Sequence, residues 1–210
     1  MSIISQEQIM ELLDKCYDSV INGIPGSKSC EELAQEYLEK HDTPQNAAKH
    51  FISYQVMKCS TSGFVTGFGG FITMPITIPA NVASVLYVQI RMIAALASMG
   101  GYDVRSDQVQ TLVYLCLVRS SITDVVKSTG VKVANKFTLK LLEKLPGKVL
   151  TKINQKVGFR LLTKFGTKGA VNLVKVVPVA GAVVGAGVDY VGTKLVARKA
   201  YNTFMLNEID

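Results

Sequence analysis

The sequence carries no charged side chain over 32 residues, from position 59 to position 90. Two prolines, Pro75 and Pro79, interrupt this stretch, and its four glycines all fall in the first half. A segment this apolar has to be buried in a protein core or in lipid, because it would aggregate in water. We therefore expect the rest of the chain to be organised around it.

This stretch predicts a helical hairpin. Proline does not continue a helix, so we expect one arm to end near Thr73 and a second arm to run from Pro79 to about Met99. Glycine lets two backbones approach closely, and neither GxxxxGK[ST] nor GxGxxG occurs, which favours helix packing over phosphate binding. The glycines expected to pack closely are Gly63, Gly67, Gly69 and Gly70.

A second uncharged run covers residues 176–188. Gly181 and Gly185 have the GxxxG spacing that lets another helix come close, and we expect this helix to continue to about Phe204. We therefore expect the two apolar regions to pack against each other inside a helical bundle.

A membrane span is the alternative for both regions. A spanning helix needs about 20 predominantly apolar residues, and the second run has 13 before Asp189. The arm after Pro79 contains Arg91, and an arginine near the bilayer centre costs roughly 2.5 to 3.5 kcal/mol. These features favour burial within the protein. A soluble fold that exposes the hairpin only under certain conditions is a further alternative.

Helix start signals divide the rest of the chain. Ser5 and Ser29 each begin a capping-box pattern, Thr43 and Pro44 form an N-cap with proline in the first turn, and Ser106 precedes a helix that is apolar on all sides and therefore central. Strict alternation of apolar and polar residues is almost absent, which predicts an all-α, single-domain multi-helix bundle. We expect residues 1–44 to form acidic amphipathic helices and residues 45–205 to form the main helical domain. The two parts are expected to pack together as one compact unit.

A row of basic residues at a spacing of four follows the central helix, with Glu143 as the single acid between Lys127 and Lys175. Four residues advance an α-helix by about 400°, so the row drifts by about 40° per step and cannot stay on one flat face. Pro146, Gly158 and Gly166 are expected to divide it into one or two cationic amphipathic helices. The row consists of Lys132, Lys136, Lys140, Lys144, Lys148, Lys152, Lys156, Arg160, Lys164 and Lys168.

The charge is unevenly distributed between the halves of the chain. Residues 1–110 hold 7 Lys/Arg and 11 Asp/Glu, a net charge of −4, whereas residues 111–210 hold 16 and 5, a net charge of +11. Such an excess makes an anionic membrane surface or lipid a candidate partner, and a solvated helix face that keeps an apolar protein soluble is the alternative that the same spacing fits. Nucleic acid is disfavoured, because Phe137, Phe159 and Phe165 occupy expected core positions and not a stacking platform.

Arg91 and Asp189 are candidates for a buried polar pair, because each is expensive to bury alone. Asp103 or Asp124 is an alternative partner for the arginine.

The sequence offers no catalytic or metal-binding set. His41 and His50 have no cysteine or carboxylate at ligand spacing, so we expect no metal and no cofactor. The cysteines at 16, 30, 59 and 116 show no CxxC pair and are typical of reduced thiols in a cytosolic protein. The acidic N-terminus is unlike a secretory signal, and we expect a cytoplasmic protein, peripheral at the inner face of the membrane.

Several short motifs occur in a fixed order along the chain. They are GFVTGFGGFITMP at 63–75, Pro79-Ala80, QIRMI at 89–93, GYD at 101–103, VPVAGAVVG at 177–185 and Asp189-Tyr190. Together they resemble the signature of the EcsC family over roughly residues 45 to 205. The resemblance implies an α-helical bacterial protein connected with membranes or transport, and it implies no catalytic residues.

We therefore expect a non-enzymatic, membrane-associated accessory or lipid-binding protein that uses its basic helices and its apolar hairpin. A membrane transporter is a further candidate partner. The alternative is a soluble protein-interaction or regulatory subunit that binds an acidic partner, and a third hypothesis is an enzyme with a site near Asp189 or Asp103.

Overall fold

The computed structural model describes residues 4–59, 80–118, 120–133, 137–165 and 181–209, and these residues are predominantly helical. Strand-type pairing among them is limited to an isolated bridge between Ile24 and Ser27. The all-α prediction is confirmed. The helices are α1 (Gln6–Asn22), α2 (Cys30–Glu39), α3 (Pro44–Cys59), α5 (Ala80–Met99), α6 (Asp107–Leu117), α7 (Ile122–Lys127), α8 (Leu139–Leu142), α9 (Gly147–Phe165) and α11 (Gly181–Met205).

The predicted helix starts are confirmed by their hydrogen bonds. Ser5 and Ser29 each form a complete capping box, in which the serine side chain accepts from a backbone N–H and the third helical residue bonds back. Thr43 Oγ1 accepts from the backbone N–H of Asn46 at 3.2 Å, and Ser106 Oγ accepts from that of Val109 at 3.3 Å. These bonds satisfy N–H groups that a helix start otherwise leaves without partners.

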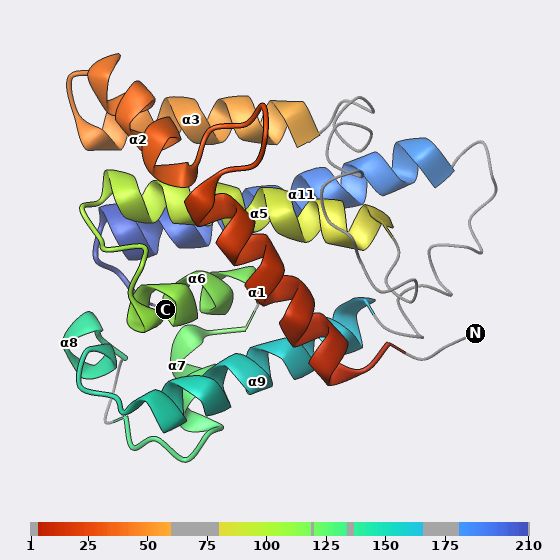
Figure 1. Ribbon diagram of the computed structural model, residues 1–210, viewed down its shortest axis with the longest axis vertical. Helices are drawn as coiled ribbons and strands as arrows, with labels where there is room; N and C mark the ends of the chain where they lie inside the picture. The colour runs from red at the N-terminus through yellow and green to blue at the C-terminus, as the bar shows by residue number, and fades with distance from the viewer. Residues whose placement is uncertain (1–3, 60–79, 119, 134–136, 166–180, 210) are drawn as a thin grey trace.

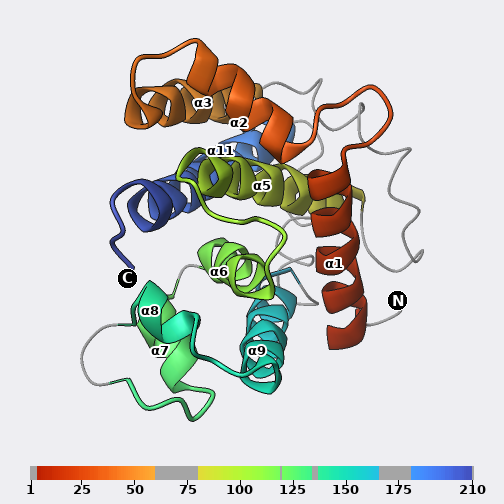
Figure 2. The same cartoon turned by 60° about the vertical axis from the view of Figure 1, so that its left-hand side comes forward.

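The helices form three layers (Figure 1). The middle layer consists of α5 and α11, which pack against each other, and α2 and α3 cover one side of it. On the other side α6 packs against α5 and against α9, with α7 beside α9. Figure 2 shows α1 running from this lower layer up to the middle one, in contact with both α9 and α5.

The core lies between these layers. In α6 every residue from Thr111 to Leu117 is buried, as its apolar sequence predicts. The helix α5 is also enclosed, and over 82–99 it is the one described helix that is long and apolar enough to cross a membrane. Because 83% of that window is buried by the rest of the chain, α5 is placed as a core helix.

Two contacts define how α5 and α11 pack. Gln89 Nε2 donates to Thr193 Oγ1 at 3.2 Å, and a β-carbon on Gly100 would lie 2.5 Å from the carbonyl oxygen of Phe204. Both pairs are 104 positions apart, so the two helices run parallel and in constant register. The second arm of the predicted hairpin therefore packs against the C-terminal apolar helix. The first arm beyond residue 59, with Gly63, Gly67, Gly69 and Gly70, lies outside the described residues.

Figure 1 shows the C-terminal ends of α3 and α9 on the same side of the molecule, at the right, as the N-terminal ends of α5 and α11. The uncharged stretches at 59–90 and 176–188 both include such an end.

Candidate functional site

The row of basic residues follows α8, α9 and the connections before them. Lys136 and Lys168 lie outside the described residues. The five residues from Lys132 to Lys152 in the described part of the row are exposed, and the last three are half-buried. We call the described members the basic surface: Lys132, Lys140, Lys144, Lys148, Lys152, Lys156, Arg160 and Lys164.

The opposite side of α9 is apolar, as predicted. Leu150, Ile153, Val157 and Leu161 are buried at helical spacing, and α9 packs there against α1 and α6. Burying each such side chain stabilises the fold by about 1.5 to 3 kcal/mol. The helix is therefore held in place by one side while the other carries the charges.

The prediction that Gly158 divides the basic row is wrong, because α9 continues through it without a break. The residue has another role. A β-carbon at this position would lie 2.6 Å from Met10 Sδ, so the missing side chain lets α1 cross α9 closely. The break at Pro146 and Gly147 is confirmed, since it separates α8 from α9.

The continuous helix explains why exposure changes along the row. Each step of four residues turns the row by about 40°, so the cations from Lys148 to Lys164 rotate by about 160°. The first of them point to solvent, while Lys156, Arg160 and Lys164 turn toward neighbouring elements and are half-buried.

The basic surface differs from the N-terminal half in its ion pairs. The ion pairs found among the described residues lie between Glu11 and Arg105. Within the same described residues, Lys144, Lys148 and Lys152 form no ion pair. The positive charge of these three lysines is thus left to act on an external anion.

The prediction that Phe159 lies in the core is wrong. Its side chain is 48% exposed, because it follows Val157 by two positions and so points about 200° away from the buried side of α9. The Nζ of Lys156 lies 5.9 Å from the centre of its ring. Phe137 is buried as predicted, and the side chain of Phe165 is outside the described part of the structure.

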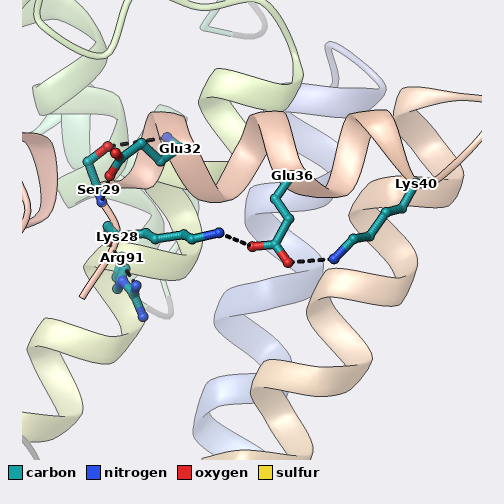
Figure 3. Close-up of polar contacts among 6 residues, drawn as sticks. All are labelled: Lys28, Ser29, Glu32, Glu36, Lys40 and Arg91. Atoms are coloured by element: carbon teal, nitrogen blue, oxygen red, sulfur yellow. Dashed lines mark hydrogen bonds and ion pairs between the residues drawn. The ribbon is translucent and has the colours of Figure 1, made fainter. Parts of the chain in front are cut away.

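Arg91 anchors α5 to the connection between α1 and α2 (Figure 3). Its Nη2 donates to the carbonyl oxygen of Lys28 at 2.9 Å, and its buried Nε has no hydrogen-bond partner among the described residues. Burial lowers the pKa of the guanidinium. The side chain of Asp189 lies outside the described part, so its pairing with Arg91 stays a prediction. Asp103 accepts instead from the backbone N–H of Arg105.

Figure 3 also shows how the acidic half compensates its own charge. Glu36 on α2 accepts from Lys28 Nζ at 2.9 Å and from Lys40. These two hydrogen bonds lower the pKa of the Glu36 carboxyl to about 2. Charges of this kind are satisfied within the chain and are not available to a partner.

Lys199 is a half-buried lysine on α11 whose contacts with α6 the sequence did not predict. Its Nζ donates to the carbonyl oxygens of Leu115 at 3.3 Å, Val118 at 3.1 Å and Ser120 at 2.7 Å. The first two carbonyls belong to the end of α6, where a cation also favours the helix dipole, and the third lies in the connection to α7. A lysine on one helix that caps another leaves no local sequence signal.

The described residues contain no group of three or more His, Cys, Asp or Glu side chains able to hold a metal ion. His41 and His50 lie together, with stacked rings whose centres are 4.4 Å apart. Burial raises the pKa of Cys16 and Cys30 to about 12 and that of Cys116 to about 11. These three thiols are therefore un-ionised at neutral pH and poor nucleophiles.

Comparison with protein families identifies the chain. The sequence model of the EcsC protein family matches residues 3–206, which includes α1 and α2 as well as the region that carries the motifs. The chain belongs to the EcsC family. No curated protein and no solved structure matches it significantly.

Proposed function

We propose that this EcsC family member is a non-enzymatic, membrane-associated accessory protein that binds anionic lipid through its basic surface. The observation that carries the proposal is the run of exposed cations on α8 and α9, which the described part of the chain does not compensate with carboxylates. Each lysine near an anionic bilayer contributes about 1 kcal/mol to binding. Several lysines on one rigid helix act together.

An apolar contact provides the second attachment. The uncharged sequence 60–79 joins α3 to α5, and partial insertion of such a segment adds to the electrostatic attraction, as in peripheral proteins that need two signals. The enclosure of α5 by the other helices supports docking over spanning. In this proposal the protein acts at the cytoplasmic face of the membrane, where a transporter is a further candidate partner.

Liposome flotation tests the proposal. We expect recovery with phosphatidylcholine vesicles that contain phosphatidylglycerol, little recovery with phosphatidylcholine alone, and loss of binding in high salt, because salt screens exposed charges. Equal recovery with both vesicle types, or none with either, would count against it.

A charge-matched pair of variants sharpens the test. Changing Lys140, Lys144 and Lys148 together to Gln should weaken vesicle binding by roughly a hundredfold. The control changes Lys15, Lys40 and Lys49 to Gln, which removes the same charge from the N-terminal half. If both triple variants lose binding equally, net charge and not the basic surface is responsible.

A specific observation also favours the second candidate, a subunit that binds another protein. Tyr54 and Met57 on α3 are 42% and 60% exposed, and Val191 and Leu195 on α11 are 53% and 49% exposed. Because α3 packs against α11, exposed apolar side chains occur on adjoining helices. Two results together would favour this function. The protein would bind none of the vesicle compositions, and it would bind an acidic protein only when the basic surface is intact.

A further inference from the structure

A groove lies beside the basic surface, between the start of α1, the end of α7 and the middle of α9. It has a volume of about 360 Å³. Its lining includes no carboxylate and contains two of the cations of the basic surface. The lining residues are Ser128, Thr129, Lys152, Gln155, Lys156 and Phe159, together with Gln6.

Contacts between α1 and α9 fix the shape of this groove. Gln6 Nε2 donates to the carbonyl oxygen of Gln155 at 2.9 Å. Gly158 lets α1 approach, and a β-carbon there would lie 3.9 Å from Gln6 Cγ. The wall formed by α1 is therefore held by a hydrogen bond and by close packing.

The hydrogen bonds already present show which groups remain for a ligand. Ser128 Oγ donates to Val125 O at 2.6 Å, and Thr129 Oγ1 donates to Val126 O at 2.7 Å, so neither hydroxyl proton faces the groove. The ammonium groups of Lys152 and Lys156, one helical turn apart on α9, are the cationic donors in its lining. Two ammonium groups without a carboxylate in the lining suit a phosphate.

Phe159 distinguishes between free phosphate and a phospholipid. Its ring is 48% exposed and lies beside the ammonium of Lys156. A free phosphate makes no use of an exposed phenyl ring. A bilayer surface offers a phosphate and an apolar boundary side by side, and aromatic rings favour that boundary.

We propose that this groove binds the headgroup phosphate of one anionic phospholipid between Lys152 and Lys156, while Phe159 enters the boundary of the acyl chains. The assignment rests on the proposed function and deepens it, because it names the residues that meet the lipid and so orients α9 on the membrane.

A fluorescent variant tests the role of Phe159. The chain contains no tryptophan, so Phe159→Trp introduces a single reporter. With vesicles of phosphatidylcholine and phosphatidylglycerol we expect its emission to shift to the blue and to be quenched by brominated acyl chains. The control is Gln45→Trp, at the exposed start of α3 and so at the other end of that helix from residues 60–79, whose emission should stay unchanged. Vesicle binding without any change in the Phe159→Trp emission overturns the proposal.

A second pair of variants tests the two lysines. Lys152→Gln with Lys156→Gln should weaken vesicle binding roughly tenfold more than Lys144→Gln with Lys148→Gln, because one pair contacts the phosphate directly and the other contributes charge alone. Unchanged thermal unfolding shows that both variants fold.

The outcomes separate the groove from the proposed function. If the two lysine pairs weaken binding equally, the groove is not a site, although the protein still binds anionic membranes. If the unmodified protein binds no vesicles, both proposals fail. The assignment to lipid is also overturned if the groove binds inorganic phosphate but the emission of Phe159→Trp does not change when vesicles are added.

Discussion

Gln89 and Thr193 form a hydrogen bond across the interface between the two long apolar helices, with Gln89 Nε2 donating to Thr193 Oγ1 at 3.2 Å. Both side chains are at least 98% buried. A polar pair in an apolar interface favours one register, because any sliding of α5 along α11 leaves two polar groups without partners. The pair thus defines how the middle layer of the bundle is assembled.

Thr193→Val removes the acceptor of this bond while keeping the shape of the side chain. The amide nitrogen of Gln89 would then be buried without its partner, so we expect the free energy of unfolding to fall by about 1 to 3 kcal/mol. Denaturation in urea measures the change. Thr193→Ser retains the hydroxyl and serves as the control. A valine variant as stable as the unmodified protein would mean that the bond contributes nothing.

Thr111 on α6 presents the opposite case. It is fully buried, and its Oγ1 has no hydrogen-bond partner among the described residues. Thr111→Val replaces the hydroxyl with a methyl group of similar size, so we expect stability to be unchanged or to rise by about 1 kcal/mol. The same denaturation experiment measures both valine variants. A loss as large as that of Thr193→Val would show that Thr111 has a partner after all.

Gly100 and Gly158 both lie in close contacts, but we expect their substitution by alanine to change stability by different amounts. At Gly100 a β-carbon would lie 2.5 Å from a backbone carbonyl, that of Phe204, whereas at Gly158 it would meet the flexible side chain of Met10. Gly100→Ala should therefore cost about 1 to 3 kcal/mol, since the backbone of α11 must shift. Gly158→Ala should be near neutral, because Met10 can move and alanine favours the helix by about 1 kcal/mol. Thermal unfolding compares the two, and equal losses would contradict this reading of the contacts.

The sequence predicts the features of this fold that depend on local chemistry. Ser5 and Ser29 show their capping boxes in four consecutive residues, and the apolar sequence of α6 requires burial wherever the helix is placed. The exposed lysines of α9 follow in the same way from spacing alone. Each of these predictions needs no knowledge of which helix is the neighbour.

The features that could not be predicted depend on the identity of that neighbour. The exposure of Phe159 is not among them, since its spacing from Val157 on α9 alone places it opposite the buried side. Gly158 matters because Met10 lies against it. Arg91 meets a carbonyl oxygen, that of Lys28, and every residue has a carbonyl, so no pattern of side chains points to this partner.

The carboxyl of Glu36 gives a prediction for pH. Its hydrogen bonds with Lys40 and Lys28 lower its pKa to about 2. A lowered pKa in the folded state means that the pair stabilises the fold above the ordinary pKa of a glutamate and loses this contribution as the pH falls toward 2. Carbon-13 NMR titration of the carboxyl groups should show Glu36 as an unusually acidic glutamate. High salt should move the Glu36 pKa back toward its ordinary value, because the group is exposed.

Substitutions can measure how much Lys40 and Lys28 each contribute to the lowered pKa of Glu36. Changing Lys40 and Lys28 together to Gln should bring the pKa of Glu36 close to that of an ordinary glutamate, and each single change should bring it part of the way. Lys49→Gln is the control, because Lys49 is exposed and is not one of the partners of Glu36. A Glu36 carboxyl that titrates normally in the unmodified protein would show that neither ion pair persists in solution, as is common for surface pairs. The N-terminal half would then present free charges of both signs, and the contrast with the basic surface would have to rest on net charge alone.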